Sequence, residues 1–192
     1  MPSFSRLLFI PEYILPPIEC IPKKIEEITG ITDQFLRQGG YDTSLGKEVG
    51  KAREFREVYL DFQDFCNTRS KGKQLVFVAH NAKFDLRMIN GELRRWRLGG
   101  KEAAPTIGNT FTCSVDTLHL FREKKWWRSL ARPSSFSLSA IYSHVFSGES
   151  FTNIHNAVGD IKGLERLLLA DQFEGWKNTA NKIQIPFIKV DK

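Results

Sequence analysis

The sequence predicts an α/β fold in which a mixed sheet is flanked by helices, and two stretches carry that prediction. Residues 75–79 form a continuous apolar run in which Val76, Phe77 and Val78 are β-branched or aromatic, typical of a strand buried on both faces. Residues 111–115 alternate between apolar and polar side chains, as a second strand would. A helix is expected after the first strand, ended by Gly99 and Gly100. Its apolar positions recur at helical spacing and are Leu86, Ile89, Leu93 and Trp96.

Length and composition fit one globular domain. A chain of 192 residues can bury a sizeable core, and we expect a single domain over 1–192 with a C-terminal extension at 171–192. Hydrophobic residues make up 41% and charged residues 26% of the chain, which is ordinary for a globular protein. The net charge of +6 suits a polyanionic partner.

No stretch of the sequence predicts membrane insertion or secretion. The apolar runs are too short to span a bilayer, and the N-terminus alternates prolines with short apolar pieces, unlike a signal peptide. Cys20, Cys66 and Cys113 lie far apart and lack the paired spacing of a zinc site. We therefore expect no membrane partner and an intracellular location, nuclear or cytoplasmic, and the oligomeric state stays open.

Short elements and one longer helix are expected before the first central strand. Residues 23–28 can form a helix ended by Gly30, and Thr32 or Asp33 can cap a further turn. An apolar face from about residue 47 to residue 67 predicts a helix packed on the sheet. Its members are Ala52, Phe55, Val58, Tyr59, Phe62, Phe65 and Cys66.

Helices dominate the expectations after the second strand. Asp116 and Thr117 are expected to cap or hydrogen-bond locally, and residues 138–145 mark a short amphipathic helix that begins after a serine. Residues 173–176 can extend the last long helix. Residues 183–190 form an apolar segment that fits an added strand or a packing arm.

The segment Lys124 to Arg128 combines cations with two adjacent indoles, a pairing that can grip phosphates and stack on bases. Two neighbouring tryptophans cannot both be buried on one face of a helix or strand, so one of Trp126 and Trp127 is expected to be exposed or to cover a loop. Nucleic-acid contact and structural packing are both open for this segment.

Asp85 lies just beyond the first predicted strand, in the first turn of the following helix, where the helix dipole favours an ionised carboxylate. Asn81 precedes it at the junction. On these residues alone, an active site at a sheet edge and ordinary capping of a helix start both fit.

His155 and Asp160 form a second candidate pair ahead of another apolar helical stripe. Five residues apart, they would point in different directions within one continuous helix, so they share a site more easily if His155 lies in a loop and Asn156 starts the helix. A histidine beside a carboxylate can act as a general base, and a structural histidine is the alternative.

These two stretches together resemble the second and third motifs of the DEDDh family of 3′→5′ exonucleases, whose fold is ribonuclease-H-like. The second motif is matched by His80, Asn81, Phe84 and Asp85, and the third by His155, Asn156, Ala157 and Asp160. Asp116, Thr117 and the helix opening near Ser137 also follow in the order of the family. The resemblance runs from about Phe9 to Leu169, and its nearest branch is the proofreading and repair exonucleases.

The resemblance implies metal-dependent hydrolysis of phosphodiester bonds at single-stranded 3′ ends of DNA or RNA. Asp85 and Asp160 would be catalytic carboxylates that bind Mg²⁺ or Mn²⁺, and His155 would take the proton from the attacking water. His80 would mainly shape the end of the strand, as part of the substrate site. The other implied substrate-binding residues are Asn81, Phe84 and Asn156.

The first motif of that family, an Asp-x-Glu on the opening strand, does not occur in these residues. We therefore expect a ribonuclease-H-like sheet without its N-terminal strand or strands. Either the chain begins downstream of the true start, or the family pattern has decayed. Two functions stay open: an exonuclease whose activity needs the first motif, and an inactive module that binds nucleic acid or protein.

Overall fold

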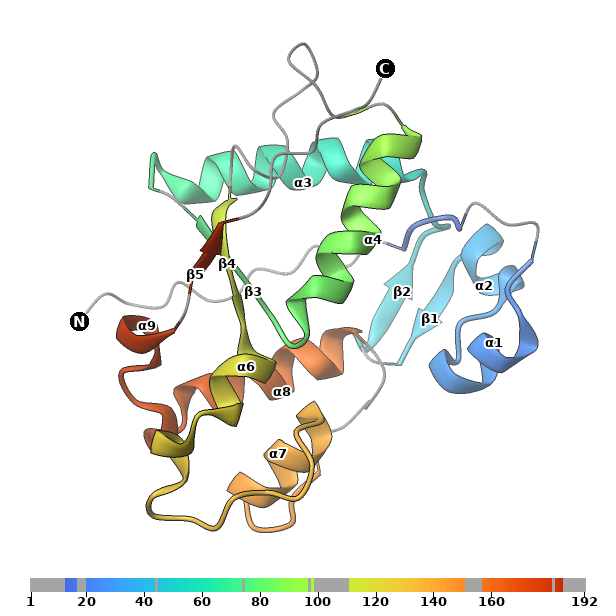
Figure 1. The fold of residues 1–192 in the computed structure, drawn as a ribbon. Helices are drawn as coiled ribbons and strands as arrows, with labels where there is room; N and C mark the ends of the chain where they lie inside the picture. The colour runs from blue at the N-terminus through green and yellow to red at the C-terminus, as the bar shows by residue number, and fades with distance from the viewer. Residues whose placement is uncertain are drawn as a thin grey trace. The chain divides into compact units, whose positions relative to one another are not determined.

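The computed structural model describes residues 13–16, 20–43, 45–73, 75–96, 98, 111–150, 157–180 and 182–184 (Figure 1). The chain divides into two compact units, residues 1–65 and 66–192, and the boundary falls within helix α3 (Phe55–Ser70). The described elements include both helices and strands, and β3, α4 and β4 follow one another, which confirms the predicted mixed α/β class. The expectation that the 192 residues form one domain stays a prediction.

The first unit begins with two short helices whose ends follow the sequence signals. Helix α1 (Lys23–Thr29) ends at Gly30, which adopts a left-handed backbone conformation. Helix α2 (Asp33–Gln38) begins after Thr32, whose hydroxyl accepts a hydrogen bond from the N–H of Phe35 at 3.1 Å. Both predicted boundaries are confirmed.

A two-stranded hairpin follows and corrects the predicted helix over residues 47–67. Strands β1 (Gly40–Asp42) and β2 (Lys47–Val49) pair antiparallel, so α3 begins only at Phe55. The hairpin depends on Gly39, because a Cβ at that position would lie 2.4 Å from the carbonyl oxygen of Val49. A backbone contact of this kind is not encoded in the periodicity of apolar residues, so the sequence pattern did not reveal the hairpin.

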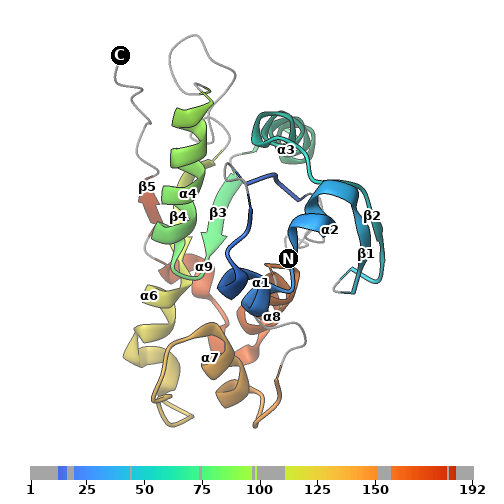
Figure 2. The ribbon, with the colours of Figure 1, turned by 90° about the vertical axis from the view of Figure 1, so that its right-hand side faces the viewer.

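The second unit contains a three-stranded sheet with β4 in the middle (Figures 1 and 2). Strand β3 (Leu75–Ala79) runs parallel to β4 (Phe111–Asp116), and β5 (Lys182–Gln184) pairs with β4 antiparallel. Both predicted central strands are confirmed, and β5 confirms an added strand within the tail. The expectation that β3 is buried on both faces is wrong, since Val76 is 37% exposed.

Helices pack against this sheet and against one another. Helix α4 (Ala82–Arg95) follows β3 directly and contacts both β3 and β4. The remaining elements are α6 (Thr117–Arg122), the 3₁₀ helix η1 (Lys124–Trp127), α7 (Leu138–Val145), α8 (Ala157–Leu169), the 3₁₀ helix η2 (Asp171–Phe173) and α9 (Trp176–Thr179). Ser137 caps α7 by accepting from the N–H of Ala140, as the sequence predicts.

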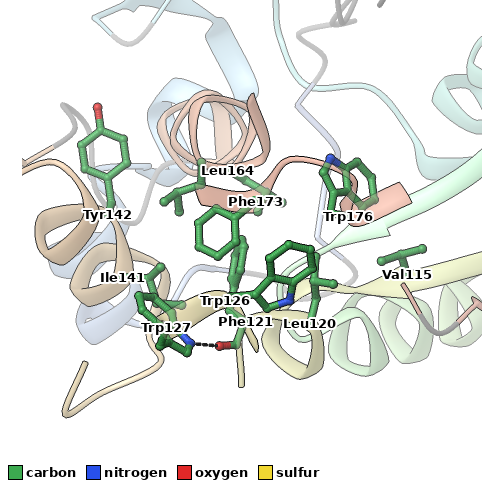
Figure 3. Close-up of a cluster of buried hydrophobic side chains, with 11 residues drawn as sticks. Val115, Leu120, Phe121, Trp126, Trp127, Ile141, Tyr142, Leu164, Phe173 and Trp176 are labelled. Atoms are coloured by element: carbon green, nitrogen blue, oxygen red, sulfur yellow. Dashed lines mark hydrogen bonds between the residues drawn. The ribbon is translucent and has the colours of Figure 1, made fainter. Parts of the chain in front are cut away.

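The main hydrophobic core of this unit gathers side chains from β4 and from the helices that follow it (Figure 3). Phe173 lies at its centre and is fully buried. Its ring centroid is 4.6 Å from that of Phe121 and within 6 Å of both Trp126 and Trp127. The largest group of buried aromatic side chains therefore holds η1 and η2 together.

Both adjacent tryptophans belong to this core, so the expectation that one of them is exposed is wrong. Each indole is only 8% exposed, and Trp127 Nε1 donates a hydrogen bond to the carbonyl of Phe121 at 2.7 Å (Figure 3). The physical reason is the 3₁₀ helix, whose three residues per turn rotate neighbouring side chains by about 120°. The two rings therefore pack against different parts of one core, and neither is free to stack on a base.

The end of α8 also differs from the sequence prediction. The helix stops at Leu169, and residues 173–176 do not extend it. The chain instead turns through η2, which places Phe173 and Trp176 in the core. Part of the predicted extension at 171–192 is thus built into the hydrophobic core.

We expect Phe173→Ala to lower the free energy of unfolding by about 3–5 kcal/mol, because it leaves a cavity among the rings of Phe121, Trp126 and Trp127. Urea unfolding followed by far-ultraviolet circular dichroism measures the change. The exposed neighbour Glu174→Ala is the control and should change the free energy by less than about 0.5 kcal/mol. Equal effects of the two substitutions would contradict this packing.

Candidate active site at the ends of two parallel strands

The carboxyl ends of β3 and β4 meet at one edge of the sheet. The strands are parallel, and their register pairs Ala79 with Asp116, so both strands end at the same level. Ligands of open α/β sheets commonly bind beyond the carboxyl ends of the strands. The predicted second motif and Asp116 therefore share the position at which such a sheet builds a site.

A single buried carboxylate joins the two strand ends. Asp116 is 8% exposed, and its Oδ1 accepts hydrogen bonds from the N–H of Leu118 at 3.0 Å and from the N–H of Asn81 at 2.9 Å. The first bond caps α6, as the sequence predicts. The second fixes the turn between β3 and α4, where Asn81 adopts a left-handed conformation that asparagine tolerates better than most residues.

His80 is held through both ring nitrogens. Nε2 lies 2.9 Å from the carbonyl oxygen of Phe136, and Nδ1 lies 3.1 Å from the hydroxyl of Thr117. A carbonyl can only accept, so Nε2 carries a proton. Burial lowers the pKa of His80, although the Phe136 carbonyl and the negative charges of Asp116 and Asp160 oppose that change. The Thr117 hydroxyl also lies 3.3 Å from the carbonyl oxygen of Ala79, to which it donates, so it links His80 to the last residue of β3. Both ring nitrogens of His80 thus have partners within the protein.

Asp85 lies in the first turn of α4, as the sequence predicts. Burial raises the pKa of its carboxyl above the ordinary value of 3.8, its own backbone N–H opposes the change, and the negative charge of Asp116 adds to it. The helix dipole was expected to favour the ionised form, yet the net direction is the opposite. The environment of Asp85 therefore favours a bound positive charge, either a proton or a cation.

Asp160 lies in the first turn of α8 and belongs to the same neighbourhood. Although burial is the main influence on the pKa of His80, the charge of Asp160 contributes to it, as that of Asp116 does. The charge of Asp116 thus acts on both Asp85 and His80, and the charge of Asp160 acts on His80. The predicted general base His155 and its neighbour Asn156 lie outside the described residues.

Two predicted substrate-binding side chains are accessible beside this edge. The side chain of Asn81 makes no capping hydrogen bond, and its residue is exposed. Phe84 is 61% exposed, although it is a large aromatic residue on a helix whose inner face packs on the sheet. Neither side chain contributes to the core, and a role for either in binding a substrate stays a prediction.

The donor chemistry of this site fits a hard divalent cation. In the part of the chain that the structure describes, no three His, Cys, Asp or Glu side chains form a group that could hold a metal ion. Mg²⁺ is commonly bound by only one or two carboxylates together with water and substrate phosphates. Asp85 and Asp160 supply oxygen ligands of that kind.

Sequence reasoning missed the long-range role of Asp116 and the anchoring of His80 by Thr117 and the Phe136 carbonyl. Asp116 follows an apolar strand and precedes a helix, the same arrangement that singles out Asp85. That shared signal, together with parallel pairing of the two strands, could have placed both carboxylates at one edge. Nothing in the sequence identifies the contact between His80 and a carbonyl 56 residues away.

No known protein family model matches the chain, and no curated protein matches it at a significant level. The resemblance to exonucleases therefore depends on the two motifs alone. Among the described helices, none combines the length and the apolar character needed to cross a membrane.

We expect Asp116→Ala to lower the free energy of unfolding by about 1–3 kcal/mol, because two backbone N–H groups lose their acceptor. Asp116→Asn keeps an oxygen acceptor and should cost clearly less. Chemical denaturation at neutral pH measures both variants. A loss as large for asparagine as for alanine would mean that the charge matters more than these hydrogen bonds.

We expect Asp85→Asn to raise the melting temperature of the metal-free protein at neutral pH. A carboxyl whose pKa is raised on folding binds its proton more tightly in the folded state, so folding stability falls as the pH rises from about 3.8 through the folded-state pKa. Asparagine removes this loss. The gain in melting temperature should disappear below about pH 3.8. The control is Asp64→Asn at an exposed position, which should not show this gain. A pH-independent gain would contradict the electrostatic origin.

Proposed function

We propose that the chain is a metal-dependent nuclease domain of DEDDh type, which hydrolyses phosphodiester bonds at single-stranded 3′ ends in an intracellular compartment. The observation that supports this most is that Asp85 follows β3 and Asp116 ends β4 at the same edge of the sheet, while the charge of Asp160 reaches His80 at that edge. Two of these acids belong to the motifs that resemble the family. A non-enzyme has no evident need to gather like charges in a partly buried place.

The arrangement of the sheet is compatible with a ribonuclease-H-like fold. Among the described strands, β3 pairs only with β4, so its other edge has no partner strand there. In the proposed fold this edge is where the strand with the first motif would belong. The proposal leaves the two carboxylates of the first motif without a counterpart in this sequence.

The proposed mechanism gives each residue one task. A divalent cation held by Asp85 and Asp160 would supply Lewis acidity at the scissile phosphate. His155 would accept the proton of the attacking water, since a histidine side chain can bind a proton near neutral pH. Asn81, Phe84 and Asn156 would hold the terminal nucleotide. His80 and Asp116 would act as positioning residues, since their polar atoms are already bonded to the protein.

The second candidate function is an inactive module that binds nucleic acid or protein. The absence of an Asp-x-Glu favours it, as does the absence of a three-ligand metal group among the described residues. Divalent cations separate the two candidates. A nuclease should gain thermal stability with Mn²⁺, and the gain should disappear in Asp160→Asn.

Release of 3′-terminal nucleotides from an end-labelled single strand in Mn²⁺ tests the nuclease proposal, and we expect only slow release because the carboxylates of the first motif do not occur in this sequence. Asp85→Asn and Asp160→Asn should each lower the rate by at least about 100-fold, because each removes a proposed metal ligand. The control is Asp171→Asn, an exposed acid beyond α8. If nucleotide release persists in both site variants, the activity comes from a contaminant. If the wild-type chain releases no nucleotide, the binding module is favoured.

A further inference from the structure

The outward face of α4 exposes an unusual set of side chains. The inner face of the helix, which includes Ala82 and Leu93, is buried. The opposite face is exposed along the whole helix and carries no acidic residue. Its members are Lys83, Phe84, Arg87, Met88, Gly91, Arg94 and Arg95.

Helical geometry arranges these side chains in two parallel rows. At about 100° per residue, the cations Lys83, Arg87 and Arg94 lie within about 40° of one another around the helix axis. Phe84 and Met88 form a second row about 60–100° away from Arg87. Met88 is 56% exposed, so two large apolar side chains face solvent beside the cations. Gly91 lies between the rows, where a Cβ would meet no other atom within 4 Å.

Within the described residues, the row of cations has no acidic partner. Arg95, which lies between Phe84 and Met88 around the helix axis, pairs with Glu92 at 2.9 Å. By contrast, the side chains of Lys83, Arg87 and Arg94 form no ion pair with any residue that the structure describes. Three neighbouring positive charges that form no ion pair in the described part of the chain favour a polyanion as the partner.

We propose that this face of α4 binds the body of a single-stranded nucleic acid, with phosphates on the row Lys83, Arg87 and Arg94 and bases on Phe84 and Met88. This inference builds on the proposed nuclease function, because Asp85 lies about 60° beyond Met88 on the same helix. Around the helix, the apolar row therefore lies between Asp85 and the row of cations. Lys83 to Arg94 spans about 16 Å, room for about five stacked nucleotides.

The chemistry favours a single strand over other anionic partners. Bases of a single strand are free to stack on an exposed aromatic ring, whereas those of a duplex are not. A membrane-bound helix needs a continuous apolar face, and here the apolar row has two members while the larger apolar face is packed on the sheet. A row of cations beside a row of apolar side chains resembles the surface of single-strand binders, in which charged groups contact the backbone and aromatic groups stack on the bases.

Binding of fluorescent 15-nucleotide single strands, one of DNA and one of RNA, tests this surface. Anisotropy is measured with EDTA, so that no cleavage can occur, and over a range of salt concentrations. Arg87→Gln with Arg94→Gln should weaken binding and reduce the salt slope by about 1.4, because each phosphate contact on a single strand contributes about 0.7. Phe84→Leu should weaken binding at least about fivefold and leave the slope unchanged.

The matched control is Lys51→Gln with Arg56→Gln, which removes two exposed charges outside α4. An equal loss in this control, or an unchanged slope in the α4 variant, would overturn the proposal. So would binding to anionic phospholipid vesicles without binding to either oligonucleotide. Thermal melting of each variant verifies that these exposed substitutions leave the fold intact.

The binding surface and the nuclease proposal can fail separately. Weakened binding in the α4 variant, combined with no nucleotide release by the wild-type chain in Mn²⁺, would support the surface and reject the nuclease. Nucleotide release by the wild-type chain, combined with normal binding by the α4 variant, would support the nuclease and reject the surface. Comparison of the DNA and RNA strands under one salt condition identifies the preferred substrate.

Discussion

The hydrogen bonds of one buried carboxylate hold the candidate site together. Asp116 accepts the N–H of Asn81, 35 residues earlier in the chain, and thereby fixes the turn from which α4 begins. The same oxygen caps α6 through Leu118. His80, between these points, is held by Thr117 and by the Phe136 carbonyl. The direction in which α4 carries Asp85 and Phe84 therefore follows from contacts made at the end of β4.

The carboxylates at this edge of the sheet lower the stability of the metal-free protein and favour the binding of a cation. Burial and the charge of Asp116 raise the pKa of Asp85, so an ionised Asp85 costs stability. Sites that bind cations commonly combine partly buried carboxylates in this way, and the cation compensates the loss when it binds. The cations on the outer face of α4 complement this edge. One helix presents a carboxylate toward the proposed metal site and cations toward the proposed strand.

Local signals predicted the elements that depend on local physics. The apolar run of β3, the cap at Thr32 and the left-handed Gly30 are encoded within a few residues and agree with the structure. Tertiary contacts decided the rest. The β1–β2 hairpin depends on the approach of Gly39 to Val49, and burial of both Trp126 and Trp127 needs a 3₁₀ turn beside Phe173. For the site, the sequence indicated Asp85 and Asp160, but the role of Asp116 needs the parallel register of β3 and β4.

The central claim is that Asp85 and Asp160 bind one divalent cation at the end of β3, and paramagnetic broadening by Mn²⁺ tests it most directly. In ¹⁵N-labelled protein, substoichiometric Mn²⁺ should broaden the amide signals of residues 81–86 and 157–161 before all others. Asp85→Asn should abolish that selectivity. Uniform weak broadening, or selective broadening at a site without either carboxylate, would contradict the claim.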